Sequence, residues 1–136
     1  MILNTSFGFM LTKAAQRLAS ICEAELLSLR LTTRQAGLLM VVKGNGPASQ
    51  KTIGELLRID RTTMVALVDD LEAKTYLKRV EDPEDRRAYR IMLSEKGKTV
   101  LGNAWRIIQS AESKGLEDLS IEERQLLAQL LLKSVK

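Results

Sequence analysis

The chain contains no histidine and only one cysteine, Cys22. Histidine is the commonest general base and a frequent metal ligand, so its absence argues against a metal centre and against most acid–base catalysis. A single cysteine cannot form an intrachain disulfide, which favours a reducing cytoplasm. The sequence also has no glycine-rich phosphate loop and no nucleophile elbow. We therefore predict a protein that is not an enzyme and that uses no cofactor or metal.

Long apolar runs are missing as well. No stretch approaches the roughly 20 apolar residues that a membrane-spanning helix needs, and the first ten residues lack the features of a secretory signal. With 136 residues, 45% of them apolar, and no internal repeat or linker, the chain fits one domain over 1–136. We expect a cytoplasmic protein without a membrane partner.

The net charge of +4 gives only a mild preference for anionic partners. Basic and acidic residues are interleaved, and no block of lysines suggests a disordered tail that binds nucleic acid. The position of the charges in the fold must therefore decide what the protein binds.

The first part of the chain predicts three helices. Apolar residues at spacings of three and four indicate a helix over 6–29. Thr32 and Gln35 fit a capping box that starts a second helix, which ends at the breaker cluster 44–47. Ser49 then starts a short third helix. We expect its inward-facing residues to be Ile53, Leu56 and Leu57.

A fourth helix follows after a short link and is capped by Asp60. One of its faces is apolar, with Met64, Leu67, Val68 and Leu71. The other is small and polar, with Thr62, Thr63, Ala66, Asp69 and Asp70. Taken alone, this helix fits a solvated surface helix. A preceding short helix makes it the second element of a helix-turn-helix, which reads the major groove.

Residues 77–80 and 90–93 predict two strands of a hairpin. The turn between them reads Asp82-Pro83-Glu84-Asp85-Arg86-Arg87, so we expect Arg86 and Arg87 at the hairpin tip. A narrow minor groove attracts arginine, and we predict that one of the two enters it. Asp85 would orient a guanidinium by a bidentate pair. The alternative is a solvated charged turn.

The DNA contacts that the sequence predicts fall into two groups. For the major groove we expect the small side chains Thr62, Thr63 and Ala66, with Arg61 at the helix start on a phosphate or guanine. Phosphate contacts, which position without reading sequence, are expected from Lys51, Lys78, Arg79 and Arg90. Lys96 and Lys98 fit this role and a solvated helix start equally well.

The last part of the chain predicts two more helices. Ser94 starts one of about 20 residues, and Ser120 with Glu123 forms the capping box of another. The final helix is rich in apolar side chains that a monomer would leave exposed: Leu126, Leu127, Leu130, Leu131, Leu132 and Val135. Such a patch usually marks an interface. We therefore expect a homodimer, whose twofold axis would set two reading helices about 34 Å apart.

The segment DRTTMVALVDDLEAKTYLKRVEDPEDRRAYRIMLSEKGK, residues 60–98, resembles the recognition helix and wing of the MarR family of bacterial transcription regulators. Its wing signature reads Asp85-Arg86-Arg87 followed by Leu93-Ser94-Glu95-Lys96-Gly97. The resemblance covers essentially the whole chain. It implies a mainly α fold with a small β-hairpin wing, a winged helix-turn-helix at about 33–97, and dimerisation helices at about 6–29 and 98–135.

The resemblance also implies function. Arg87 would enter the minor groove, Asp85 would hold the wing arginine, and Thr62, Thr63 and Ala66 would face the major groove. Proteins of this kind are usually homodimers that bind short palindromes in double-stranded DNA. Many release DNA when a small, often anionic aromatic effector binds between the dimerisation helices and the winged module. We therefore expect a ligand-responsive repressor.

The chain departs from the family pattern at two positions. Thr75 stands where a glycine usually ends the recognition helix, and a β-branched residue is strained there if the backbone is left-handed. Asp70 stands where a basic residue is common, and a carboxylate near phosphates would weaken binding.

Two other functions stay open. In one, the fold is a protein-interaction module with weak or lost DNA binding, and Asp69, Asp70 and Glu72 face a basic partner. In the other, the protein senses oxidants through Cys22, as some members of the family do. A buried inert thiol is the simpler interpretation of Cys22, because Glu23 and Glu25 lie nearby and that helix contains no tyrosine partner. The lack of histidine disfavours zinc sensing.

Overall fold

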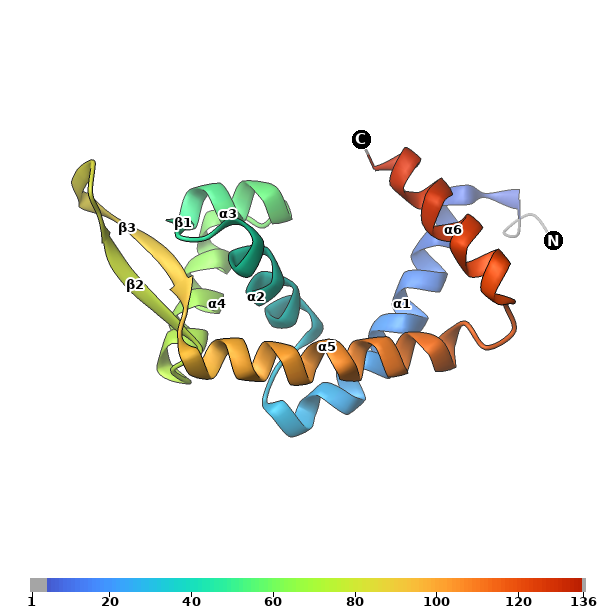
Figure 1. Cartoon of the computed structure of the whole chain (residues 1–136). Coiled ribbons are helices and arrows are strands. Elements are labelled where there is room, and N and C mark those ends of the chain that lie inside the picture. Colours follow the sequence, from blue (N-terminus) through green and yellow to red (C-terminus); the bar gives the residue numbers. More distant parts are fainter. Residues whose placement is uncertain (1–4, 136) are drawn as a thin grey trace.

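The computed structural model describes residues 5–135, apart from the side chain of Arg86. A β-hairpin wing projects from one end of an elongated molecule, the long helix α5 runs along most of its length, and α1 and α6 lie at the other end (Figure 1). The elements are α1 (Phe7–Leu26), η2 (Leu27–Leu29), α2 (Thr33–Asn45), β1 (Ala48–Ser49), α3 (Gln50–Leu57), α4 (Arg61–Ala73), β2 (Leu77–Asp82), β3 (Asp85–Leu93), α5 (Glu95–Gly115) and α6 (Ile121–Ser134).

The helix starts are set by side-chain caps, as the sequence predicts. The Thr32 hydroxyl accepts from the N–H of Gln35, whose own side chain accepts from the N–H of Thr32, so this capping box is complete. Ser120 and Glu123 form the second box at α6. Ser49, Asp60 and Ser94 cap the helices that follow them. Each cap satisfies N–H groups that a helix start leaves without partners.

The predicted first helix is confirmed with a change at its end. It is α-helical to Leu26 and then tightens into the single 3-10 turn η2. Arg30 follows in a left-handed conformation, with φ of 57°, and donates its N–H to Leu27. This sharp turn lets α2 run back across the core.

The sheet has strand order β1-β3-β2 and is antiparallel throughout. The sequence does not predict the strand β1, because it is two residues long and exists only through pairing with Arg90 and Ile91 of β3. Both hairpin strands are longer than predicted. The prediction that the arginines lie at the tip is wrong for their backbone, since Arg86 and Arg87 belong to β3 and the turn is at Pro83 and Glu84.

The core joins the winged module to the middle of α5. Its fully buried large side chains include Leu26, Leu31, Leu38, Leu39, Ile53, Met64, Leu71 and Ile91. Ile91 and Leu93 point inward, as predicted. Leu56 does not, because its side chain is 56% exposed on the outer face of α3. The short α3 buries only the side that carries Ile53 and Gly54.

The two terminal helices contribute little to this core. Among the described residues, α6 has none that is buried, and α1 has only Cys22 and Leu26. The ion pair between Lys114 and Glu25, with Nζ and Oε1 2.8 Å apart, holds α5 beside α1. Over residues 5–135, no helix is long and apolar enough to cross a membrane.

Candidate nucleic-acid interface

The start of α4 is fixed by Asp60. Its Oδ2 accepts from the N–H of Thr63 at 3.0 Å, and its Oδ1 accepts from the Thr63 hydroxyl at 2.6 Å. The Thr63 hydroxyl, followed by its N–H, holds the pKa of the Asp60 carboxyl below its usual value. Thr63 is therefore half-buried and engaged in the cap, which leaves its methyl group as the part available for contact.

The N-terminal half of α4 presents free side chains. Arg61, Thr62 and Ala66 are all exposed. Within the described residues, the side chains of Arg61 and Thr62 make no hydrogen bond or ion pair. These three residues lie within about 1.5 turns of the helix start, where the partial positive charge of the helix favours an anion.

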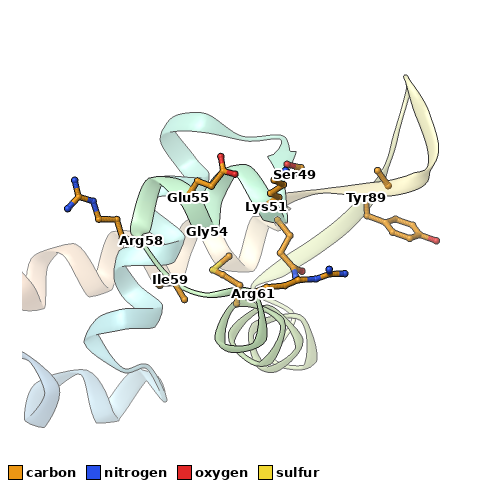
Figure 2. Close-up of a pocket in the computed structure, with 11 residues that line it drawn as sticks. Ser49, Lys51, Gly54, Glu55, Arg58, Ile59, Arg61 and Tyr89 are labelled. Carbon is orange, nitrogen blue, oxygen red and sulfur yellow. The ribbon is translucent and has the colours of Figure 1, made fainter. Parts of the chain in front are cut away.

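A cavity of about 690 Å³ lies between α3, the start of α4 and the wing. Its lining includes Lys51, Arg61, Met64 and Tyr89. Figure 2 shows Lys51 and Arg61 extending toward the wing, whereas Arg58 points away from it. Lys51 is exposed and, in the part of the chain that the structure describes, has no carboxylate partner. Two cations therefore converge beside the reading face of α4.

The hairpin ladder is interrupted where the arginines lie. Glu81 pairs with Tyr89, but the next residue of β2, Asp82, pairs with Asp85, so β3 carries the extra residues. A bulge of this kind bends a strand and redirects its side chains. Asp85 Oδ1 accepts from the backbone N–H of Arg87 at 2.9 Å. Asp85 thus orders the backbone that carries Arg87.

Arg87 is exposed, and none of the ion pairs among the described side chains involves it. The predicted pairing of Asp85 with a guanidinium stays a prediction, because Asp85 contacts the backbone of Arg87 and the side chain of Arg86 lies outside the described residues.

The C-terminal half of α4 differs, because its carboxylates have partners within the molecule. Asp69 and Glu72 both bind Arg79 of β2, at 2.7 Å and 2.5 Å. The sequence predicts Arg79 as a phosphate contact, but here it joins the wing to α4. Arg90, another predicted phosphate contact, forms an ion pair with Asp82, with Nε and Oδ2 3.4 Å apart.

Asp70 turns toward α2. Its Oδ2 accepts from Gln35 Nε2 at 2.5 Å and lies 2.8 Å from Lys74 Nζ. Lys74 also donates to the carbonyl of Arg30 at 2.6 Å. Hydrogen bonds from Lys74 and then Gln35 hold the pKa of the Asp70 carboxyl below its usual value. These contacts contradict the expectation that Asp69, Asp70 and Glu72 present free charge to a basic partner.

At the end of α4, Thr75 has the left-handed backbone on which the predicted strain depends. Its φ is 67°, and the N–H groups of Thr75 and Tyr76 donate to Glu72 and Leu71. This is the Schellman pattern, whose left-handed residue is usually glycine. Further along the chain, Gly97 packs against the carbonyl of Tyr76, and a Cβ at Gly97 would overlap that oxygen.

Cys22 is 5% exposed in the core. Burial, with Glu112 and Glu25 nearby, raises the pKa of its thiol. A redox sensor needs the opposite shift, toward the reactive thiolate. The environment of Cys22 therefore favours the inert thiol over the sensor. Within residues 5–135, no group of three or more metal-binding side chains could hold a metal ion.

The geometry can be compared with known proteins. The family model for the MarR family matches residues 31–88. The transcriptional repressor NicR of Pseudomonas putida is 27% identical over 94% of this chain and 81% of its own. A probable transcriptional regulator from Pseudomonas aeruginosa is 28% identical, with a TM-score of 0.87 over 98% of this chain and 99% of its own. The repressor CouR, solved with a 23-mer DNA duplex, is 27% identical, with a TM-score of 0.90 over 98% of this chain and 95% of its own.

In sequence and fold, this chain is similar to the MarR family. It is a winged-helix transcriptional regulator and not an enzyme.

The sequence interpretation missed two residues that line the cavity of the candidate interface. Tyr89 and Arg58 both line the cavity beside α4. Tyr89 stands opposite Glu81 in the last regular pair of the hairpin before the bulge, two residues from Ile91 on β3. Arg58 lies at the cavity because it ends α3 in a left-handed conformation, with φ of 53°. The sequence predicts the link 58–60, but nothing in it indicates that backbone.

Proposed function

We propose that this protein is a homodimeric, sequence-specific repressor, acting in the cytoplasm on a palindromic operator and released by a small aromatic or anionic effector. The observation that carries the proposal is the division of α4. Its first half offers Arg61, Thr62 and Ala66, with Lys51 beside Arg61, while its second half holds its carboxylates internally. The wing adds the exposed Arg87. On α4, a duplex would therefore meet a free cation and small side chains, while the carboxylates of that helix stay paired; among the described residues, Glu55 of α3 is the one acidic residue that lines the neighbouring cavity.

The roles follow from the chemistry of each side chain. Thr62, the Thr63 methyl group and Ala66 suit base edges and thymine methyls in the major groove. Lys51 and Arg61 would neutralise phosphates of the strand that passes through the cavity beside α4. Arg87, with Arg86 next to it, would enter the adjoining minor groove. The relatives NicR, a repressor, and CouR, a repressor solved on DNA, support a DNA-binding repressor.

The homodimer is supported by the apolar side chains at the helical end. Phe7 and Leu132 are 79% and 73% exposed in the single chain. Exposed apolar side chains also follow the rest of α6: Ile121, Leu126, Leu130, Leu131 and Val135. A second copy would cover this surface and supply the second reading helix that a palindrome requires.

Binding of promoter fragments by fluorescence anisotropy over a series of salt concentrations tests the DNA-binding proposal. Log K should fall with log salt by about 0.9 for each phosphate contact. Arg87→Ala should weaken binding by about 1 kcal/mol or more, the scale of a good arginine contact to DNA. Arg106→Ala removes the same charge from the exposed face of α5 and should have little effect. Equal affinities for the Arg87→Ala variant and the wild type would contradict the role of the wing.

The effector is supported by a second cavity, of about 270 Å³, between α2 and α5. It is lined by Met40, Lys43, Leu101, Gly102 and Trp105. An indole ring with one lysine suits a single aromatic ring that carries an anionic group. The cavity lies between α2 of the winged module and α5, the helix that runs to the helical end. A ligand bound there would change the position of α5 relative to the winged module.

Trp105 is the only tryptophan, so its fluorescence reports directly on this cavity. A titration with aromatic carboxylates should quench or shift that emission and should lower DNA affinity. Lys43→Met should weaken the response, while Lys133→Met, on the last turn of α6, should not. An effector that releases DNA without changing Trp105 emission, and equally well in the Lys43→Met variant, would place the effector site elsewhere.

A further inference from the structure

One guanidinium of the wing binds two carboxylates of α4. Arg79 of β2 places Nη1 2.5 Å from Glu72 Oε1 and Nη2 2.7 Å from Asp69 Oδ1. The two carboxylates stand three residues apart on α4, so they lie on one face of the helix. The two Nη atoms of the planar guanidinium therefore each have their own acceptor on the same helix, a geometry that lysine cannot reproduce.

The register of the hairpin explains why Arg79 points toward α4. Leu77 pairs with Leu93 and Arg79 pairs with Ile91, and all three leucine and isoleucine side chains are buried. Side chains alternate along a strand, so Arg79 shares the inner face of β2 with Leu77, and Lys78 takes the outer face. The Arg79 side chain is only 27% exposed.

The outer part of the wing has little else to hold it. The third strand, β1, pairs only with Arg90 and Ile91 at the base. Beyond that point, β2 and β3 form a two-stranded hairpin, an arrangement of marginal stability when it stands alone. Arg79 lies opposite Ile91, within the three-stranded part and one residue before its outer end at Val80 and Arg90. An anchor at this level fixes the direction in which the rest of the wing projects.

We propose that Arg79, held by Asp69 and Glu72, is a positioning residue that sets the angle between the wing and the recognition helix, and that it does not contact DNA. The inference rests on the proposed function, since the angle matters because α4 and the wing must enter neighbouring grooves together. Groups that bind a ligand precisely need supporting hydrogen bonds behind them. The other two interpretations are that Arg79 binds a phosphate, or that Asp69 and Glu72 only repel DNA.

The double variant Asp69→Asn/Glu72→Gln separates these interpretations by the sign of its effect. It removes two negative charges near the DNA face and frees Arg79. If Arg79 binds phosphate, or if the carboxylates only repel DNA, operator affinity should rise. If Arg79 positions the wing, affinity should fall by about fivefold, the scale of partly exposed ion pairs. Glu117→Gln/Asp118→Asn, on the turn before α6, removes the same charge elsewhere and should not weaken binding.

Arg79→Ala provides a second readout. As a positioning residue, Arg79 should leave the salt slope unchanged when it is removed, whereas Lys51→Ala should make the slope shallower by about 0.9, the value of one phosphate contact. The loss of DNA affinity caused by Arg79→Ala should also disappear in an Arg87→Ala background, because Arg79 acts only by positioning the wing. Arg79→Lys should restore part of the affinity. The inference is overturned if the salt slope of Arg79→Ala becomes shallower as it does for Lys51→Ala. It is also overturned if the losses of affinity from Arg79→Ala and Arg87→Ala add fully in the double variant.

Hydrogen exchange without DNA keeps the test independent of the proposed function. In Asp69→Asn/Glu72→Gln, amides of residues 80–89 should exchange faster than in the wild type, while those of α6 should not change. If exchange in residues 80–89 is the same in the variant and the wild type, Arg79 does not hold the wing and the inference is overturned. Failure of the wild type to bind any operator refutes the proposed function, and the exchange measurement still decides whether Arg79 holds the wing.

Discussion

The winged end and the helical end of this chain differ in how much of their apolar surface is buried within a single copy. At the winged end, Met64, Val68 and Leu71 of α4 pack with Ile91 and Leu93 of the wing, and all five are buried. At the helical end, no described residue of α6 is buried. The same chain therefore builds one end as a finished core and leaves the other as an uncovered apolar surface.

The difference shows where each end gets its stability. Burying a leucine side chain contributes roughly 1.5–3 kcal/mol, and the winged end obtains this within one chain. The helical end can obtain it only from a second molecule. The winged module is the part that meets DNA in our proposal, and the helical end is the part that would set the distance between two such modules.

The largest expected effect comes from making the helical end polar. Leu126→Glu/Leu130→Glu places two charges one turn apart on α6, at side chains that a single chain already leaves exposed. We expect a folded monomer whose affinity for a palindromic operator falls by about 100-fold or more, since linked binding to two half-sites commonly contributes that much. Analytical ultracentrifugation and anisotropy measure the two quantities.

Gln125→Glu, on another face of α6, is the matched control and should remain dimeric. If the double variant also remains a dimer with wild-type affinity, the helical end is not the interface and the contrast between the two ends disappears. Circular dichroism establishes that the variant is folded.

A second test concerns the tight fit of the winged end. A Cβ at Gly97 would overlap the Tyr76 carbonyl oxygen and lie 3.0 Å from its carbon, both backbone atoms that cannot move independently. Gly97→Ala should lower the free energy of unfolding by about 3 kcal/mol, as overpacking of a dense core does. Urea denaturation measures it.

Gly102 lies on the same helix, and a Cβ at this position would have no neighbouring atom within 4 Å. Gly102→Ala should therefore stabilise α5 by about 0.5–1 kcal/mol. Equal effects of the two substitutions would mean that the winged end is looser than its contacts indicate.

A third prediction concerns the strained end of the recognition helix. Thr75 has φ of 67°. Thr75→Gly should stabilise the protein by about 1 kcal/mol, because a left-handed conformation costs a β-branched residue more than glycine. Thr75→Ala keeps the Cβ and should gain much less. A gain for alanine equal to that for glycine would assign the effect to removal of the hydroxyl, which donates to the Lys74 carbonyl.

The sequence predicts the parts of the fold that depend on local chemistry. Caps such as Thr32 and Ser120 act on residues three positions away, so the helix starts can be predicted closely. The left-handed backbone of Thr75 is also predictable, because the position ends a helix. The strand β1 and the bulge in β3 are not, since both depend on pairing between segments far apart in the chain.

The site follows the same rule. The exposure of Arg61, Thr62 and Ala66 can be predicted from the period of one helix. The partners of Asp69, Asp70 and Arg79 cannot, because each contact joins different elements. Period alone places Asp70 on the polar face, and only the packing of α2 against α4 shows that Gln35, 6% exposed, reaches it.

The smallest expected effect tests this link between the two ends. Asp70 joins α4 to Gln35 and, through Lys74, to the Arg30 carbonyl, beside the turn that follows α1. Its carboxyl pKa is lower in the folded protein than its ordinary value of 3.8. A depressed carboxyl pKa stabilises the folded state above the unfolded pKa, and this contribution is lost as the pH falls through the folded pKa.

Asp70→Asn should therefore lower the free energy of unfolding by less than about 1 kcal/mol at pH 7, as partly exposed ion pairs do, and the difference from the wild type should vanish in acid. Asp118→Asn, whose aspartate makes no hydrogen bond or ion pair within residues 5–135, is the control for charge alone. Urea denaturation between pH 7 and pH 3 follows both variants. A cost for Asp70→Asn that persists unchanged in acid would mean that the link acts through packing, and not through the charge of Asp70.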